Sequence, residues 1–224
     1  VDNNGTSGVP RVILDTVYDA AGNRTSLSAS INGTGDFFND YTHDALHRLT
    51  RVDQIGQTGG NSVAEKRVDL AYNASGQFTS IARYKDTDGG TTHEVATSAY
   101  SYDTMGRLTG LAYTQGGNNL FTPYSWSFDS LSSPGIGQGG GDPRVGATAS
   151  AAVNAAAGRV TQMVSQDGTS DYGYDATSQL TSGTHTYQTN ESYSYDSNGN
   201  RTMSGYQTGD DNRLTSDGTY NYLY

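Results

Sequence analysis

The chain has 224 residues, a formal net charge of −10 and only 33% hydrophobic residues, with 17 Tyr, 29 Gly and 4 Pro. Because ordinary globular cores are built mainly from aliphatic side chains, tyrosine must supply much of the buried area here while its hydroxyl stays wet or hydrogen-bonded. The 13 scattered Lys and Arg form no basic stripe, no apolar run is long enough to cross a membrane, and cysteine is absent, which argues against nucleic-acid binding, a spanning helix and thiol or disulfide chemistry.

Residues 1–10 form a polar lead or linker, and residues 11–224 form an array of β-hairpins. Low hydrophobicity with high net charge is also typical of disorder, but alternating segments joined by turn sequences favour a folded chain. Arg11–Tyr18 is predicted to be a strand and leads into Tyr-Asp-Ala-Ala-Gly-Asn-Arg-Thr. Asp19 can accept backbone hydrogen bonds, and Gly22 can take the positive φ that closes a three-residue loop with a bulge. Arg24 then lies opposite Tyr18, as Arg201 lies opposite Tyr195 in a later copy, and we expect a cation–π contact in each pair.

Related sequences recur along the chain, and a recurring unit is the first feature to interpret. The copy at 41–50 has His43 before the turn, His47 in place of glycine and an Asp44–Arg48 pair. The copy at 72–79 replaces the charged pair by amides. In the clearest copy, Tyr100–Thr109, we expect Tyr102 opposite Leu108 and Asp103 opposite Arg107. Since side chains alternate across a strand, one face of this hairpin is aromatic and must pack on a neighbour.

A degraded copy begins at Trp126 and is interrupted by a Gly- and Ala-rich insertion at about 131–157. We expect Gly158–Thr161 to resume the second strand. The insertion is interpreted as a surface excursion or a partner-binding loop, and its alanine run could form a short helical turn. Later copies start at Tyr172 and Tyr195, and a half-copy starts at Asn212. The predicted repeat motif comprises Tyr18, Asp19, Gly22, Arg24, Tyr41, Asp44, Arg48, Tyr72, Asn73, Gly76, Tyr100, Tyr102, Asp103, Gly106, Arg107, Tyr174, Asp175, Tyr195, Asp196, Gly199 and Arg201.

These sequences, Tyr-x-Tyr-Asp-x-x-Gly-Arg-Leu-Thr and Tyr-Asp-x-x-Gly-Asn-Arg-Thr, resemble the YD-repeat (Rhs) family over nearly the whole chain. The resemblance implies secreted or surface proteins whose hairpins wind into a hollow shell. In that family such shells enclose toxin domains, act as toxin-complex components or serve in cell contact. We therefore expect an all-β fold in which successive antiparallel β-hairpins form a wound, curved sheet with open edges that is able to polymerise. The irregular spacing of the turns also favours a winding sheet over a strict solenoid.

No constellation of residues predicts catalysis, a metal centre or a cofactor. His43 and His47 flank a turn, so their i, i+4 spacing indicates a structural role rather than chelation. We expect no carboxylate or thiol pair beside His93 or His185. Asp86–Gly89 and Asp196–Gly199 resemble fragments of calcium loops but lack the full alternation of oxygen ligands. Asp142-Pro143 lacks the context of the family's self-cleaving pair. Sequons at Asn4, Asn32, Asn73 and Asn190 are candidate glycosylation sites, as are two within the turns at Asn23 and Asn200.

The sequence thus predicts a structural, non-enzymatic segment of an extracellular or cell-surface bacterial protein. Its expected partners are adjoining repeats or other copies, because a truncated sheet has edges that recruit strands. The assembly is a closed shell or an extracellular fibre joined through the Arg11–Tyr18 strand. A carbohydrate-binding adhesin, with exposed Tyr and Trp126 as platforms for a glycan, is the alternative. A third possibility is the shell of a polymorphic toxin, with the encapsulated cargo outside this sequence.

Overall fold

The computed structural model describes residues 2–5, 7–57, 63–129 and 158–224. These residues are nearly all β-structure, and the one helix among them is a three-residue 3-10 turn at Asp210–Asn212. The all-β prediction of successive antiparallel hairpins is confirmed. The chain divides into two compact units, Val1–Pro123 and Tyr124–Tyr224. The predicted insertion at about 131–157 lies outside the described residues.

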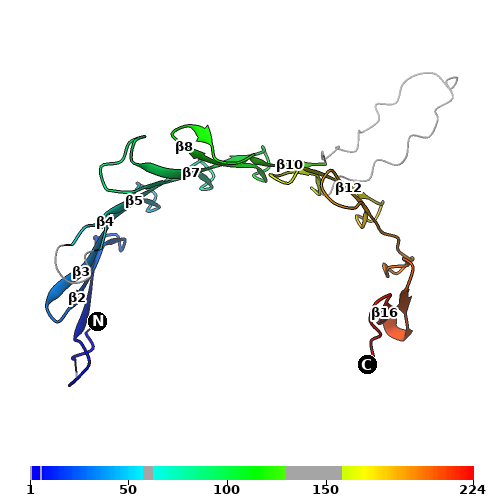
Figure 1. Cartoon of the computed structure of the whole chain (residues 1–224), viewed down its shortest axis with the longest axis horizontal. Coiled ribbons are helices and arrows are strands. Elements are labelled where there is room, and N and C mark those ends of the chain that lie inside the picture. Colours follow the sequence, from blue (N-terminus) through cyan, green and yellow to red (C-terminus); the bar gives the residue numbers. More distant parts are fainter. Residues whose placement is uncertain (1, 6, 58–62, 130–157) are drawn as a thin grey trace. The chain divides into compact units, whose positions relative to one another are not determined.

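Unit 1 is a single antiparallel sheet in which each strand lies beside the one before it (Figure 1). Strand β9 adds to β8, and β1 is at the edge. The strands are β1 (Val12–Tyr18), β2 (Arg24–Ile31), β3 (Thr34–His43), β4 (Leu49–Ile55), β5 (Lys66–Tyr72), β6 (Phe78–Tyr84), β7 (Glu94–Tyr102), β8 (Leu108–Gln115) and β9 (Asn118–Asn119).

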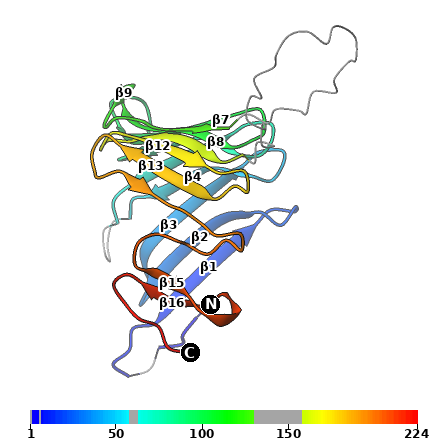
Figure 2. The same cartoon turned by 90° about the vertical axis from the view of Figure 1, so that its right-hand side faces the viewer.

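Unit 2 repeats the pattern with shorter strands, and its last hairpin forms a separate two-stranded sheet near the C-terminus (Figure 2). The strands of the first sheet are β10 (Tyr124–Phe128), β11 (Val160–Val164), β12 (Thr169–Tyr174), β13 (Leu180–His185) and β14 (Glu191–Ser192), in that order. The last hairpin consists of β15 (Tyr206–Thr208) and β16 (Leu214–Asp217).

Neither unit has a conventional core. Among the described residues, Ala29 is the one hydrophobic residue that is fully buried, and the fully buried polar residues include Ser98 and Ser170. Most strand residues are half-buried because each sheet is a single layer, so neighbours in the sheet cover a side chain only at its flanks. Tyrosine supplies contact area as expected, but it does so between adjacent strands rather than in an interior.

The predicted hairpin register is confirmed at the clearest copy. Tyr102 pairs with Leu108, and the Asp103 amide donates to the carbonyl of Arg107 at 3.0 Å. The register shifts by one residue just before the turn, at Ser101/Tyr102, and the same shift recurs at Val17/Tyr18, Thr42/His43, Ala71/Tyr72, Ser127/Phe128 and Gly173/Tyr174. A bulge of this kind is what a three-residue loop closed by a positive-φ residue requires.

Candidate functional site: a ladder of contacts between successive turns

Seven of the hairpin turns in the described residues share one arrangement around an Asp or Asn. We number them by that residue: turn 1 (Asp19), turn 2 (Asp44), turn 3 (Asn73), turn 4 (Asp103), turn 5 (Asp129), turn 6 (Asp175) and turn 7 (Asp196). In turn 4 the Oδ1 atom of Asp103 accepts the backbone N–H groups of Met105 and Arg107, each at 2.9 Å. Gly106 has φ of +78°. The other oxygen, Oδ2, accepts Nε of Arg107 at 2.6 Å.

Turn 5 shows that the arrangement survives a long interruption. Asp129 and Arg159 are separated by the insertion, yet the Asp129 amide donates to the Arg159 carbonyl at 3.0 Å. Oδ1 of Asp129 accepts the Arg159 amide at 2.8 Å, and Oδ2 accepts its Nε at 2.8 Å. Phe128 pairs with Val160 on β11. The prediction that Gly158–Thr161 resumes the interrupted hairpin is confirmed.

The last turn position takes a left-handed backbone conformation even without glycine. His47 in turn 2 has φ of +62° and Ser178 in turn 6 has φ of +73°. His47 also lies 2.9 Å through Nδ1 from Nδ2 of Asn23, in turn 1. The sequence prediction that His43 and His47 are structural residues flanking a turn agrees with their places, at the end of β3 and inside the turn.

These turns lower the pKa of their carboxyl groups. Backbone N–H donation from Arg48 and Arg107 is the main cause for Asp44 and Asp103, and the Gln179 amide is the main cause for Asp175. For Asp196 the amide side chain of Asn200 comes first. A hydrogen bond to the ionised form favours that form, so each of these aspartates is held as a carboxylate by its own turn.

Several turns also contact the next turn within their own unit. Arg48 of turn 2 stacks over the ring of Tyr72, 4.6 Å from the centroid, and donates through Nη1 to the carbonyl of Asn73 at 3.2 Å. Arg159 of turn 5 repeats both contacts with turn 6, lying 4.8 Å over Tyr174 and donating to the carbonyl of Asp175 at 3.3 Å. The guanidinium therefore links its own aspartate, the next tyrosine and the next turn's backbone.

The tyrosine directly before a turn returns a hydrogen bond to the hairpin behind it. The hydroxyl of Tyr72 donates to the carbonyl of Leu49 at 2.8 Å, that of Tyr174 to Val160 at 2.7 Å, and that of Tyr195 to Leu180 at 2.9 Å. In each case the acceptor is the first residue after the preceding turn. We call this repeated set of arginine and tyrosine contacts the turn ladder.

Two predicted cation–π contacts are wrong in their partner. Arg24 was expected to stack on Tyr18 and Arg201 on Tyr195. Both arginines do lie opposite those tyrosines. However, Arg24 stacks over Tyr41 on β3 at 4.3 Å. Arg201 stacks at 4.9 Å over Tyr193, two residues before Tyr195 in the same hairpin, and at 5.8 Å over Tyr206 on β15.

The expectation that no carboxylate pair lies beside His93 is wrong, and the contacts of His185 were not predicted. His93 lies in hydrogen-bond contact with Asp86, and ligand atoms of Asp86, Asp88 and His93 lie within 4.8 Å of one another. This group is partly buried, with the side chains of His93 and Asp86 32% and 25% exposed. In unit 2, Nδ1 of His185 lies 2.8 Å from Oγ of Ser170.

The second cluster has the composition of a catalytic triad but not its accessibility. Nε2 of His185 lies 4.0 Å from Oε2 of Glu191. Oγ of Ser170 also lies 2.9 Å from the Tyr187 hydroxyl, and Ser170 has no solvent-exposed surface. A nucleophile needs room for a reacting atom about 3 Å away. The serine hydroxyl here is enclosed by two ring partners, so this cluster joins β12 to β13 and the residues that follow.

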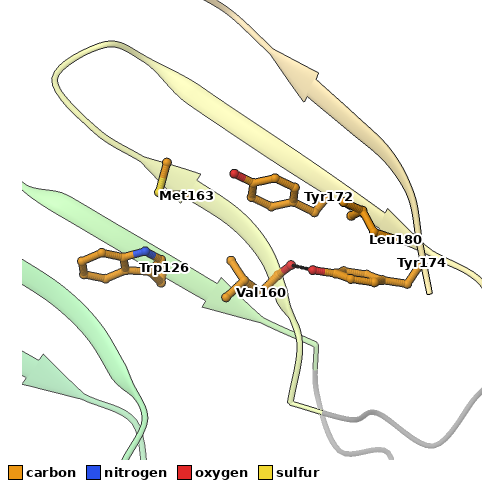
Figure 3. Close-up of a pocket in the computed structure, with 6 residues that line it drawn as sticks. All are labelled: Trp126, Val160, Met163, Tyr172, Tyr174 and Leu180. Atoms are coloured by element: carbon orange, nitrogen blue, oxygen red, sulfur yellow. Dashed lines mark hydrogen bonds between the residues drawn. The ribbon is translucent and has the colours of Figure 1, made fainter. Parts of the chain in front are cut away.

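The aromatic face of unit 2 is hollowed into a pocket of about 300 Å³ across β10 to β13. Figure 3 shows the lining residues, with the Tyr174 hydroxyl bonded to the Val160 carbonyl at one end. Tyr124 stacks on Trp126 with ring centroids 6.2 Å apart and planes inclined by 13°. The pocket is lined by Trp126, Val160, Met163, Tyr172, Tyr174 and Leu180.

Three of the candidate sequon asparagines use their side chains in hydrogen bonds within the fold. Nδ2 of Asn73 donates to Gln77 and its Oδ1 accepts two turn amides, so this side chain is part of its turn. Oδ1 of Asn32 accepts the Arg11 amide, and that of Asn190 accepts the His185 amide. Asn4 is exposed with φ of +56°.

None of the helices in the described ranges is long and apolar enough to cross a bilayer.

No protein family and no curated protein matches the sequence, but solved structures do. A chain of the structure described as "Crystal Structure of TcdB2-TccC3-Cdc42" aligns with 85% of this chain at 14% identity and a TM-score of 0.51. A chain of the Photorhabdus luminescens Tc holotoxin pore aligns with 94% at 12% identity and a TM-score of 0.36. This chain spans 9% and 12% of the length of those two chains. The first likeness shows that the fold of the aligned part of that chain recurs here.

Proposed function

We propose that this chain is a non-enzymatic wall segment of YD-repeat type, part of a secreted or cell-surface bacterial assembly. The observation that carries the proposal is the turn ladder. In it, an arginine guanidinium and a tyrosine hydroxyl at equivalent positions join one hairpin to the next, as at turns 2 and 3 and at turns 5 and 6. The fold likeness to a chain of a TcdB2-TccC3 complex supports the same assignment. The wall belongs to a shell that encloses cargo, or to an extracellular fibre.

Several features of the sheets support a structural role. Several polar groups that could serve chemistry are instead used in turns, as in Asp103 with Arg107, or are enclosed, as Ser170 is. The single-layer sheets expose both faces, so a wall of this kind separates two compartments with little protein. Its stability comes from edge-to-edge pairing, since a hairpin cannot persist alone in water.

Electron microscopy of the purified chain tests the proposal. We expect closed hollow particles for a shell component or indefinite polymers for a fibre, and either form should be lost on Tyr174→Ala. Tyr220, which is 67% exposed, supplies the matched control, and Tyr220→Ala should leave the particles unchanged. Featureless monomers of the folded, unmodified chain, or particles that persist unchanged after Tyr174→Ala, would overturn the wall assignment.

The pocket on the aromatic face favours a second candidate, a carbohydrate-binding adhesin. Trp126 and Tyr172 present ring surface to an open, mostly apolar hollow, and pockets of this size commonly hold small ligands. Glycan-array binding that disappears with Trp126→Ala and persists with Tyr220→Ala would support this candidate. Absence of any glycan signal with folded protein would remove it.

A further inference from the structure

The loop between β6 and β7 in unit 1 brings three metal-ligating side chains together. The ends of the loop are closed by a hydrogen bond from the Lys85 amide to the His93 carbonyl at 2.9 Å. Nδ1 of His93 lies 2.5 Å from Oδ2 of Asp86, and a carboxylate oxygen of Asp88 completes a group whose ligand atoms all lie within 4.8 Å of one another. Among the described residues, no other three His, Asp or Glu side chains are grouped so closely.

The loop is held in place by contacts from outside it. Nη2 of Arg51, on β4, donates to the Thr87 carbonyl at 3.3 Å, and Oγ1 of Thr87 donates to Oε2 of Glu65 at 3.2 Å. Within the loop the His93 amide donates to the carbonyl of Gly90, which has φ of +96°. The three side chains are therefore positioned by hydrogen bonds that do not use their own metal-ligating atoms.

Asp86 uses its carboxylate differently from the aspartates of the turns. In turn 4, Oδ1 of Asp103 accepts two backbone amides and Oδ2 accepts Nε of Arg107. In Asp86, Oδ2 contacts His93, and this contact is the main reason that the pKa of Asp86 lies below its ordinary value. Its Oδ1 is buried and has no hydrogen-bond partner in the described part of the chain. A buried carboxylate oxygen without a donor is unfavourable, and a bound cation would satisfy it.

The guanidinium groups near the loop are already paired with other carboxylates. Arg51 forms an ion pair with Asp53 of its own strand, and Arg67, which lies beside the loop, does so with Asp69. Asp88 forms no ion pair within the residues that the structure describes. The two loop aspartates thus supply negative charge that a divalent cation would balance.

We propose that Asp86, Asp88 and His93 bind one divalent first-row transition-metal ion such as Zn²⁺. One imidazole nitrogen with two carboxylate oxygens is a donor set of this class. Ca²⁺ takes about six to eight oxygen ligands and Mg²⁺ also prefers oxygen, so His93 disfavours both. Water completes the coordination, since the side chains of Asp86 and His93 are partly exposed. The inference goes beyond the proposed function, because a wall segment requires no ion.

Binding requires only a small adjustment of the loop. Ligand atoms about 2.1 Å from a common ion are about 3.0–3.4 Å apart. Nδ1 of His93 and Oδ2 of Asp86 must therefore separate by about 0.5–1 Å, and the ion replaces the proton that they share, which leaves to solvent. Asp88 must move inward, which its exposed side chain can do by a change of rotamer.

Titration of the full chain with zinc chloride, followed by calorimetry and NMR, tests the proposal. We expect one ion per chain, with shifts centred on the amides of residues 85–94. Asp88→Asn and His93→Gln should each weaken binding at least about tenfold, because even an outer partner of a metal ligand is worth about 10–100-fold in affinity. Asp88→Asn preserves the size of an exposed side chain, so this variant retains the fold.

His47→Gln is the matched control, since His47 is an exposed histidine of the same unit outside the cluster. It should bind Zn²⁺ as the unmodified chain does. Co²⁺ gives a second readout, because its visible absorption depends on its ligands and should change with His93→Gln. Absence of saturable Zn²⁺ binding, equal affinity of the His93→Gln and unmodified chains, shifts centred outside residues 85–94, or tighter binding of Ca²⁺ than of Zn²⁺ would overturn the proposal.

Discussion

Units 1 and 2 use the same turns with very different amounts of sheet. Most strands of unit 1 have seven to ten residues, for example β3 with 10. In unit 2 the strands have five or six residues and shrink to two at β14. Nevertheless Tyr195, beyond β14, still donates to Leu180, and Asn200 of turn 7 still donates to Asn212 at 3.0 Å. The comparison indicates that the turn ladder, rather than strand length, is the constant element of this fold.

Lowering the pH should produce the largest difference in stability between the two units. The turn aspartates have a lowered pKa in the folded chain, so the unfolded chain binds protons first as pH falls. Their stabilising effect is complete above about pH 4, the ordinary pKa of Asp, and is lost as pH falls through the lower folded values. Because unit 2 has less sheet to compensate, its amides should lose hydrogen-exchange protection at a higher pH than those of unit 1.

The amide turn of unit 1 gives a control for the acid experiment. Asn73 holds turn 3 without a titratable group, and its Oδ1 accepts the same two amides as an aspartate does. Asp103→Asn should therefore keep turn 4 folded and flatten the acid response near that turn. Identical acid profiles for the two units, or no change with Asp103→Asn, would contradict the role of the turn carboxylates.

Removing a tyrosine of the turn ladder should give the next largest loss of stability. Tyr72→Ala and Tyr174→Ala each remove a half-buried ring, its arginine stack and one hydrogen bond, which we expect to cost about 1–3 kcal/mol of unfolding free energy. The same loss of free energy should expose a larger fraction of the amides of unit 2 than of unit 1 to hydrogen exchange. Hydrogen exchange of the strands on both sides measures this. Tyr→Phe at either position should cost only about 0.5–1.5 kcal/mol, and an equal cost for Phe and Ala would contradict the stacking argument.

Substitution of the arginines tests their stacking on the tyrosine of the next hairpin separately from the tyrosine hydrogen bond. Arg48→Gln and Arg159→Gln keep a hydrogen-bond donor, as Gln77 and Gln179 do in other turns, but lose the cation over the ring. We expect each change to cost about 0.5–2 kcal/mol by chemical denaturation. The fluorescence of Trp126, in unit 2, should respond to Arg159→Gln and not to Arg48→Gln; a response to both would mean that the effect does not follow the ladder within one unit.

The smallest effects concern the left-handed residues. Ser178→Gly in unit 2 should stabilise the chain by about 1 kcal/mol, because glycine takes a positive φ without the clash that a side chain meets. His47→Gly in unit 1 should gain less, since it also loses the contact with Asn23. Thermal unfolding of both variants is the measurement. A larger gain for His47 would show that its imidazole contributes nothing to the join between turns 1 and 2.

The turns were predictable from the sequence because their residues are close together in the chain. The contacts between hairpins were not, because their residues are far apart in the chain. Asp103 and Gly106 specify a turn by themselves, so the register of each hairpin follows, even across the insertion at turn 5. The stacking partner of Arg24 was not predictable from its hairpin, because which hairpin lies alongside depends on linkers of variable length. The contacts of His93 with Asp86 and of His185 with Ser170 were missed for a related reason: no spacing rule links residues that a loop or a strand pairing brings together.

The scarcity of fully buried apolar residues has a consequence for how such a chain is made. A fold with Ala29 as its one buried hydrophobic residue in the described ranges has no central nucleus that must wait for distant segments to arrive. Each hairpin needs only the hairpin synthesised just before it, which has already presented its arginine and its carbonyl. Such a chain can therefore take its native form in the direction of synthesis, one hairpin at a time, and a pause in synthesis would leave a shorter but properly formed sheet.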